Sequence, residues 1–437
     1  MKDHRLYSTA LFLVVVFIFS LQKESDRESS IPTNAYSSDL VLQWMDMQLE
    51  LMRTSSPFIG GLPPSRPFAY TGIALYESVL PGMPAYRSLC GQLADMPAMP
   101  QPVTGSVYHW PTCANAALAA MNRNFFPSTS NANKAAIKAL EEKLNAIYKT
   151  EAGNEVFQRS LKFGQEVAQL IFEWSTTDGY SKANAPYTPP VGPGLWAPTP
   201  TAFATAFGPY WGNNRLFVPG SLDGSAQSTP PAYSTDPSSD YYKMVKEVYD
   251  ISQKLTPDQR ALAVFYRDYP GYGDGHYQSI LKQILKQEKS KLDVAAIAYA
   301  KTGIACVDAG IGCWITKYRY NQERPVKYIR EVMGHSSWSP LFDNPPFPDF
   351  PSGHSTIAGA YAEILKGFFG NSYHFIDHTY DYLGMPPRTY NSFDELAKEV
   401  SDSRVYAGIH YRYSCDKGVE QGRKIGENIN RKLNFLK

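Results

Sequence analysis

Three short segments in the last third of the chain carry side chains that could hold a small oxyanion. In the first, Lys317 and Arg324 are seven residues apart and Pro325 follows at once. Because seven residues make two turns of a helix, both cations return to one face, and the proline marks where that helix must end. A lysine and an arginine at this spacing are more often a solvated face than a site, so this segment alone decides nothing.

The second segment, residues 345–355, has the sequence PPFPDFPSGHS, a proline-rich run that ends in small residues at the start of a helix. A helix start presents unpaired backbone N–H groups and a positive dipole end, and Gly353 permits close approach of an anion. Ser352 adds a hydroxyl, and His354 can give or take a proton near neutral pH. An ordinary serine helix cap with an incidental histidine explains this segment equally well.

The third segment favours an anion site. Arg404 and His410 are six residues apart, and the apolar and small residues between them indicate the inside of a helical bundle. A buried arginine needs an anionic partner. Since no carboxylate lies at the nearest helical positions, a bound oxyanion is a natural partner for Arg404.

In this order the three segments, K-x6-R-P, P-S-G-H and S-R-x5-H, resemble the signature of the family that joins the vanadium-dependent haloperoxidases to the membrane-type acid phosphatases. The match covers residues 317–410, less than a quarter of the chain, and keeps the internal spacing of all three parts. The resemblance implies that His410 bonds vanadium axially and that His354 is the acid–base group. It also implies that five groups bind the vanadate oxygens: Lys317, Arg324, Arg404, the Ser352 hydroxyl and the Gly353 N–H.

The chemistry of such a site is coherent. Three fixed cations offset the charge of the anion, guanidinium groups match the edges of a tetrahedral oxyanion, and neutral imidazole is a good ligand for a Lewis-acidic centre. His354 would take a proton from hydrogen peroxide, and Lys317 would polarise the peroxide so that a halide is oxidised to hypohalous acid. By family analogy we expect iodide as the halide, with bromide as the alternative.

The same site would bind phosphate, because vanadate and phosphate are nearly isosteric. In an acid phosphatase, His410 would be the nucleophile and His354 would protonate the leaving alcohol. Trp314, three residues before Lys317, and Phe347, seven before His354, match aromatic positions beside the halide in the chloroperoxidase branch and favour the peroxidase. Either aromatic residue alone is equally well explained as part of an ordinary core.

Two alternatives lie outside oxyanion chemistry, a haem peroxidase and a non-enzymatic exported binding module. The chain lacks a CxxCH haem-attachment motif, although a single proximal histidine leaves no mark in a sequence. A non-enzymatic binding module would give His354 and His410 no functional role.

One departure from the family pattern concerns the group that orients His410. The family often has an acid four residues after this histidine, where this chain has Ser414, and Asp416 follows two residues later. A second candidate is Asp268 on an earlier helix, which could pair with Arg404. The sequence therefore leaves open which acid orients the histidine.

Helices must position these segments. Apolar residues recur three and four apart in 39–53, 67–80, 109–125, 133–148 and 153–175, and helices are expected again near 240–254, 276–288, 292–321, 355–369, 393–412 and 416–434. Thr256, Pro257 and Gln259 predict the capped start of a further helix. We therefore expect an all-α fold, a large helical bundle domain made of two packed four-helix bundles.

Residues 177–239 are rich in Pro, Gly, Ser and Thr and include aromatics such as Trp196. A connection of this length is either a functional covering loop or a linker, and its aromatics favour a packed loop. We expect a single haloperoxidase-like domain over 36–437, divided into an N-terminal helical half (36–176), this connection (177–239) and a catalytic half (240–437).

Composition and the N-terminus indicate partners and location. The 42 Lys and Arg against 41 Asp and Glu give a formal net charge of +1, so no overall field draws the protein onto nucleic acid. Residues 1–21 begin with basic side chains and continue through an apolar run, which is typical of a secretory signal. We expect export to the periplasm or the medium with no stable membrane insertion after signal removal; an uncleaved anchor is the alternative.

The five cysteines are odd in number and include no CxxC pair, which argues against a zinc site and a dense disulfide framework. Cys90 and Cys113 could form one disulfide in an oxidising compartment. Cys306 and Cys313 lie at helical spacing among apolar residues and are expected as buried thiols.

Overall fold

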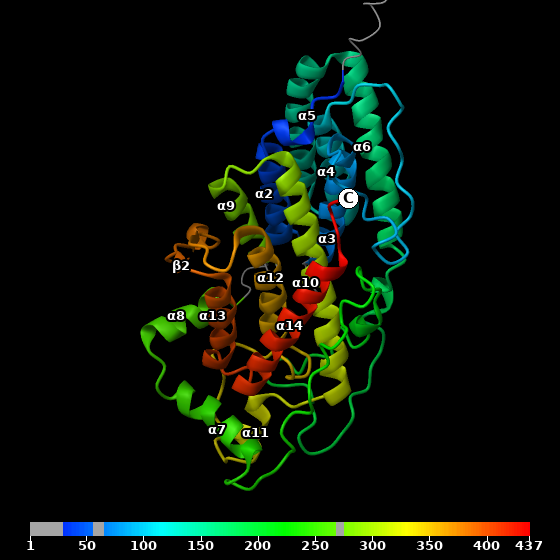
Figure 1. Ribbon diagram of the computed structural model, residues 1–437. Helices are drawn as coiled ribbons and strands as arrows, with labels where there is room; N and C mark the ends of the chain where they lie inside the picture. The colour runs from blue at the N-terminus through cyan, green and yellow to red at the C-terminus, as the bar shows by residue number, and fades with distance from the viewer. Residues whose placement is uncertain (1–28, 56–64, 268–274) are drawn as a thin grey trace, which may run out of the picture.

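The computed structural model describes residues 29–55, 65–267 and 275–437, so the expected signal segment, residues 1–21, lies outside the described residues. Within the described ranges the chain is predominantly helical, which confirms the expected all-α fold (Figure 1). A single small sheet is described there: β1 (Phe375–Asp377) pairs antiparallel with β2 (Arg388–Tyr390). Strands of three residues are too short to show the alternation that marks a strand in a sequence.

The helices form two groups. The first contains α2 (Asp39–Thr54), α3 (Ser65–Val79), α4 (Trp110–Phe125), α5 (Asn131–Ala152) and α6 (Asn154–Ser175), with α4 packed against α3, α5 and α6. The second contains α7 (Asp240–Ser252), α8 (Pro257–Phe265), α9 (Gly275–Gln287), α10 (Leu292–Tyr320), α11 (Pro325–Glu331), α12 (Gly353–Phe369), α13 (Phe393–Tyr406) and α14 (Arg412–Lys432). The expected capping box at Thr256 is confirmed at the start of α8.

Helix α10 joins the two groups, because it packs against α3 on one side and against α12 and α14 on the other (Figure 1). Its length and hydropathy would suffice to cross a membrane, but 89% of its most apolar window is buried inside the protein. A helix that is apolar on all sides and enclosed by other helices is a core helix. Its last turn carries Lys317 into the region where α12 begins.

Helices α12 and α14 approach closely beside the start of α12. A Cβ atom at Gly418 would lie 2.8 Å from the carbonyl oxygen of Ser352, so only glycine allows this spacing. The backbone N–H of Ser352 donates a 3.0 Å hydrogen bond to the carbonyl oxygen of Ser414. The start of α14 therefore holds the proline-rich segment and the first turn of α12 in place.

The connection 177–239 is a packed loop, as its aromatics predict. Trp196 and Trp211 are each 1% exposed, and the backbone N–H of Trp196 donates to the carbonyl oxygen of Asn321 at 2.6 Å. The buried carboxylate of Asp308 on α10 accepts hydrogen bonds from the backbone N–H groups of Phe217 (2.7 Å) and Val218 (3.0 Å). These bonds fasten the connection along the half of α10 that leads to Lys317.

Three expectations differ from the structure. The helix expected over 393–412 ends at Tyr406, because Gly408 follows with a φ of 78°. The short helix α11 was not expected, since seven residues carry too little periodicity to be detected. The suggested disulfide between Cys90 and Cys113 is wrong, because both residues are thiols, and Cys306 and Cys313 are buried as expected.

Candidate oxyanion-binding site

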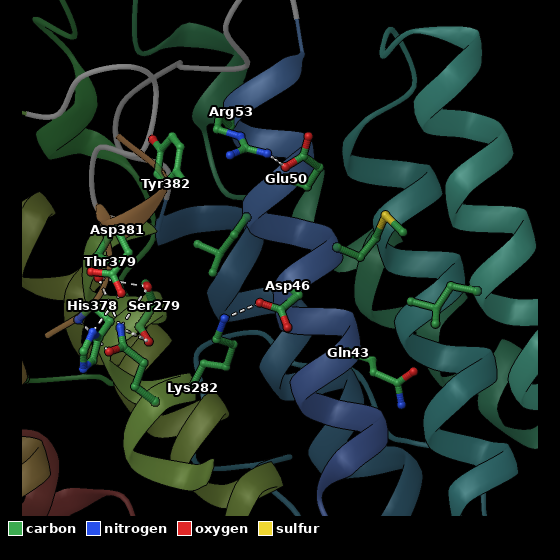
Figure 2. Close-up of a pocket in the computed structure, with 14 residues that line it drawn as sticks. Gln43, Asp46, Glu50, Arg53, Ser279, Lys282, His378, Thr379, Asp381 and Tyr382 are labelled. Atoms are coloured by element: carbon green, nitrogen blue, oxygen red, sulfur yellow. Dashed lines mark hydrogen bonds and ion pairs between the residues drawn. The ribbon is translucent and has the colours of Figure 1, made fainter. Parts of the chain in front are cut away.

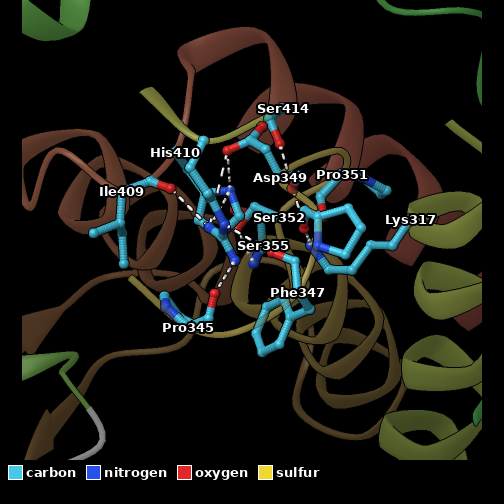
Figure 3. Close-up of polar contacts among 12 residues, drawn as sticks. Lys317, Pro345, Phe347, Asp349, Pro351, Ser352, Ser355, Ile409, His410 and Ser414 are labelled. Atoms are coloured by element: carbon cyan, nitrogen blue, oxygen red, sulfur yellow. Dashed lines mark hydrogen bonds and ion pairs between the residues drawn. The ribbon is translucent and has the colours of Figure 1, made fainter. Parts of the chain in front are cut away.

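The three sequence segments meet where the second group of helices converges (Figure 3). Lys317 comes from the last turns of α10, Arg324 is the residue before α11, and Ser352 is the N-cap of α12. Arg404 lies near the end of α13, and His410 lies in the short turn between α13 and α14. The early end of α13 thus places His410 on a turn rather than on the helix.

Lys317 organises the proline-rich segment around its ammonium group. The side chain is 0% exposed, and Nζ donates to the carbonyl oxygens of Pro348 (2.9 Å), Asp349 (2.9 Å) and Pro351 (2.6 Å). An ammonium group has three N–H donors, so these three bonds use all of them. Burial, helped by the charge of Arg324, lowers the pKa of Lys317 to about 8.

Arg324 joins the proline-rich segment to the turn that carries His410. Its Nε donates to the carbonyl oxygen of Phe347 at 2.9 Å, and Nη1 donates to the carbonyl oxygen of Ile409 at 2.7 Å. Nη1 also lies 3.1 Å from Nε2 of His410. Burial, together with the nearby charge of Arg404, lowers the pKa of Arg324 to about 10, so the guanidinium stays charged at neutral pH.

His410 is 2% exposed and lies between a cation and a carboxylate. Its Nε2 faces Arg324, and its Nδ1 lies 2.8 Å from Oδ1 of Asp349 (Figure 3). Burial and the charges of Arg324 and Lys317 hold the pKa of His410 well below its ordinary value of 6.5, so the imidazole is neutral at pH 7. Burial raises the pKa of Asp349 to about 6, which leaves its carboxylate mostly ionised at pH 7.

The first turn of α12 forms another wall of the site. The Ser352 hydroxyl accepts hydrogen bonds from the backbone N–H (3.4 Å) and the hydroxyl (3.0 Å) of Ser355. A Cβ atom at Gly353 would lie 3.3 Å from the indole ring of Trp314 and 4.0 Å from Cε of Lys317. Any side chain at this position would therefore intrude between the helix start and Lys317.

His354, the next residue, is only partly buried, and its carbonyl oxygen accepts a 3.2 Å hydrogen bond from the Tyr277 hydroxyl. Its charge is among those that lower the pKa of His410, so the two histidines belong to one electrostatic environment. An acid–base group that is partly exposed beside a buried neutral histidine can exchange protons with solvent.

The two aromatic residues expected near a halide lie against the cations. The rings of Trp314 and Phe347 have centroids 5.1 Å apart at 56°. The Phe347 ring lies 5.0 Å from Nζ of Lys317 and 5.0 Å from Cζ of Arg324, both within cation–π range. Because Phe347 is partly exposed like His354, these two residues border the side of the cluster that faces solvent.

Arg404 is 2% exposed, and its Nη1 donates to the carbonyl oxygen of Tyr266 at the end of α8. Its Cζ lies 5.7 Å from the centre of the Phe342 ring. Its charge lowers the pKa values of both Arg324 and His410, so it lies within electrostatic range of them. Contacts bring Lys317, Arg324 and His410 together around the proline-rich segment and the start of α12, and Arg404 and His354 act on this cluster through their charges. Lys317 uses all three N–H groups on carbonyl oxygens, so the expected bond from Lys317 to an oxyanion is not available in this structure.

The sequence left open which acid orients His410, and the structure places a third residue there. Asp349 contacts Nδ1, whereas Asp416 is exposed on the first turns of α14. Asp268 lies outside the described residues. The signal for Asp349 was an acid within an otherwise apolar, proline-rich run, five residues before His354.

A separate pocket of about 660 Å³ opens between α2, α9 and the segment that follows β1 (Figure 2). Its charged residues pair with one another: Lys282 with Asp46, Arg53 with Glu50, and His378 with Asp381 at 2.8 Å. None of the sequence-predicted site residues lines this pocket.

Comparisons with known proteins agree with the fold. Residues 298–436 match a family described as the VCPO second helical-bundle domain. The vanadium chloroperoxidase of Curvularia inaequalis is 27% identical over 145 residues, and the match spans 27% of this chain and 24% of that protein, about a quarter of its length.

Solved structures extend the similarity over most of the chain. A bacterial vanadium-dependent iodoperoxidase superposes with a TM-score of 0.82 and 33% identity, over 93% of this chain and 99% of that chain. The apo form of a bacterial vanadium-dependent chloroperoxidase has a TM-score of 0.63 and 16% identity, over 84% of this chain and 94% of that chain. Its holo form has a TM-score of 0.64 and 15% identity, over 87% of this chain and 95% of that chain. At these identities the likeness concerns the fold alone. On the identity and coverage shared with the iodoperoxidase, the chain belongs to the vanadium-dependent haloperoxidase family.

Proposed function

We propose that this protein is a vanadate-dependent haloperoxidase that oxidises a halide, iodide in the first place, with hydrogen peroxide to hypohalous acid. The observation that carries the proposal is the 3.1 Å contact between Arg324 and the Nε2 atom of a neutral, buried His410, inside a cluster of buried cations. A neutral imidazole nitrogen beside fixed positive charges is suited to bind an oxyanion through its central atom.

The residues present fit vanadate. Lys317 and Arg324 are both completely buried, and the charge of Arg324 lowers the pKa of Lys317, so an anion between them would relieve their repulsion. In the part of the chain that the structure describes, Asp349 is the carboxylate found against Arg324, at 3.9 Å. The glycine at position 353 keeps the space beside Lys317 clear of a side chain, as an oxyanion at the start of α12 would require.

Each residue has a distinct task in the proposed reaction. Vanadate, when bound, supplies a Lewis-acidic centre that makes hydrogen peroxide reactive toward a halide. His410 would hold it through Nε2, and Arg324, Arg404, Ser352 and the backbone N–H of Gly353 would bind its oxygens. Lys317 contributes positive charge, since its three N–H groups are engaged with carbonyl oxygens.

His354 would serve as the acid–base group, because the residue is partly buried, follows Gly353 and acts electrostatically on His410, and its imidazole can accept a proton from hydrogen peroxide. The Trp314 and Phe347 rings would border the halide. Iodide is proposed because the relative that is 33% identical over 93% of this chain is an iodoperoxidase. Bromide is the next candidate.

The test is to incubate purified apo-protein with vanadate and hydrogen peroxide and to assay oxidation of iodide, bromide and chloride. Hydrolysis of a phosphate ester without vanadate is assayed in parallel, because the same site would accept phosphate. We expect iodide oxidation that requires vanadate and is lost in His410→Ala. The control is His378→Ala, an exposed histidine on the rim of the separate pocket, which should retain full activity. Hydrolysis without halide oxidation would instead indicate a phosphatase.

We also propose that the protein is exported, on the basis of the basic start and apolar run of residues 1–21. Burial of α10 in the core supports the proposal that the mature protein has no stable membrane insertion. Cell fractionation with N-terminal sequencing of the mature protein tests both points. Recovery in the membrane fraction with residues 1–21 still attached would overturn them.

A further inference from the structure

We propose that Asp349 is the positioning residue that fixes the tautomer of His410 and so directs Nε2 toward the bound oxyanion. The inference rests on the proposed function for the identity of the oxyanion, but its first step concerns the protein alone. The two nitrogens of the His410 ring have nearest partners of opposite kinds: Oδ1 of Asp349 lies 2.8 Å from Nδ1, and Nη1 of Arg324 lies 3.1 Å from Nε2 and farther, 3.5 Å, from Nδ1.

These partners determine where the ring proton lies. A guanidinium group can only donate hydrogen bonds, so the atom facing Arg324, Nε2, must present a lone pair. An ionised carboxylate can only accept, so its 2.8 Å approach favours a hydrogen on Nδ1, although the contact is an ion-pair approach and not an aligned hydrogen bond. Both contacts therefore favour the same neutral tautomer, the one whose Nε2 can bond a Lewis-acidic atom.

Asp349 is itself held in place by the elements around the site. Its backbone N–H donates to the carbonyl oxygen of Gln322 at 2.9 Å, and its carbonyl oxygen accepts from Lys317 (2.9 Å) and from the Ser414 hydroxyl (3.1 Å) (Figure 3). The residue is 0% exposed. A carboxylate with both backbone groups bonded has little freedom to leave the histidine.

Position 414 explains why the acid comes from the proline-rich segment. Ser414 lies four residues after His410 and is completely buried, and its hydroxyl is bonded to the backbone of Asp349. The orienting carboxylate thus comes from residue 349, before α12, and the serine at 414 supports its backbone. The exposed Asp416 is not needed for this task.

The experiment compares Asp349→Asn with two matched aspartate variants in the full-length protein. Asp416→Asn removes an exposed acid six residues after the same histidine, and Asp308→Asn removes an equally buried acid from the middle of α10. The first readout is ¹⁵N NMR of the histidine side chains, with the His410 signal assigned by its loss in His410→Gln. The second readout is vanadate affinity, measured by ⁵¹V NMR titration without peroxide or halide.

We expect the wild-type protein to show His410 protonated at Nδ1. Asp349→Asn should lose this uniform tautomer and bind vanadate roughly 10- to 100-fold more weakly, as is usual when a partner of a metal-bound histidine is removed. Both control variants should keep the tautomer and the affinity, even if Asp308→Asn is less stable.

The outcomes separate the two proposals. Protonation of wild-type His410 at Nε2 overturns the role of Asp349 without any variant, so a poorly folded Asp349→Asn does not remove the test. An unchanged tautomer and affinity in a folded Asp349→Asn overturns it as well. If the wild type shows the Nδ1–H tautomer but binds no vanadate, the role of Asp349 stands and the proposed function fails.

Discussion

The carbonyl oxygen of Pro351 accepts a 2.6 Å hydrogen bond from the ammonium group of Lys317, across 34 residues of sequence. This bond and those to Pro348 and Asp349 wrap the proline-rich segment around one buried charge. Proline residues have no N–H to offer a neighbouring strand or helix, so the carbonyl oxygens of such a segment need a donor from elsewhere. Lys317 therefore has a structural role in addition to the charge that it brings to an anion.

Replacing Lys317 by methionine tests this double role. The change keeps the length of the side chain and removes the donor of three buried carbonyl oxygens, so we expect a loss of at least about 2 kcal/mol of stability and a large loss of vanadate affinity. Chemical unfolding and vanadate titration measure the two effects. Lys327→Met is the control for vanadate affinity, because Lys327 also donates to a carbonyl oxygen, that of Leu195, but is partly exposed; its ion pair with the buried Glu323 means that it too contributes to stability. Equal losses of vanadate affinity in the two variants would contradict the prediction.

Gly353→Ala should weaken anion binding while the fold is kept. Its Cβ atom would lie 3.3 Å from the Trp314 ring and 4.0 Å from Lys317, so it would crowd the start of α12 where an oxyanion is expected. We expect vanadate affinity to fall by about tenfold or more, equivalent to about 1.4 kcal/mol. Gly367→Ala on the same helix is the control, because its Cβ atom would be 3.5 Å from the Asn430 side chain, an ordinary contact. Unaltered vanadate affinity in Gly353→Ala would show that the first turn of α12 is not part of the binding site.

His354→Ala should retain vanadate and lose turnover. The change removes proton transfer but leaves Lys317, Arg324 and His410 in place, so we expect a vanadate affinity within a few-fold of wild type and a fall in kcat of about 100-fold or more. Steady-state halide oxidation and ⁵¹V titration on the same preparation separate the two quantities. Wild-type turnover in His354→Ala would refute the role of this histidine as the acid–base group.

The buried Asp308 should make the stability of the protein depend on pH. Burial raises the pKa of Asp308 from its ordinary 3.8 to about 7, so the folded protein holds a proton that the unfolded chain has lost between these pH values. Stability therefore falls as the pH rises from 4 to 7, by up to about 4 kcal/mol from this group. Residue 308 cannot titrate in Asp308→Asn. The free energy of unfolding of the variant minus that of the wild type should therefore increase as the pH rises from 4 to 7.

Urea unfolding of both proteins at pH 5, 6, 7 and 8 measures this difference. The isosteric change also removes one of the two acceptors for the backbone N–H groups of Phe217 and Val218, which lowers stability by an amount that does not vary with pH. Stability curves that remain parallel over the whole range would show that Asp308 does not titrate as stated.

The sequence by itself was sufficient to predict the helical fold and the types of residue that form the site. The apolar periodicity of α2 and α6, the apolar character of α10 and the caps at Thr256 and Ser352 are local properties, and local interactions decide them. The spacing between Lys317 and Arg324 and between Arg404 and His410 can also be read directly from the sequence. These features made an oxyanion site predictable before its geometry was known.

Only the tertiary structure decided which groups touch. The turn that carries His410 begins where α13 ends, and its contact with Asp349 joins residues 61 positions apart, on segments that α14 and Lys317 hold together. Likewise, the engagement of all three Lys317 donors depends on the path of a proline-rich segment that has no regular hydrogen-bond pattern of its own. Long-range packing sets such contacts, and no periodicity or spacing in a single sequence encodes them.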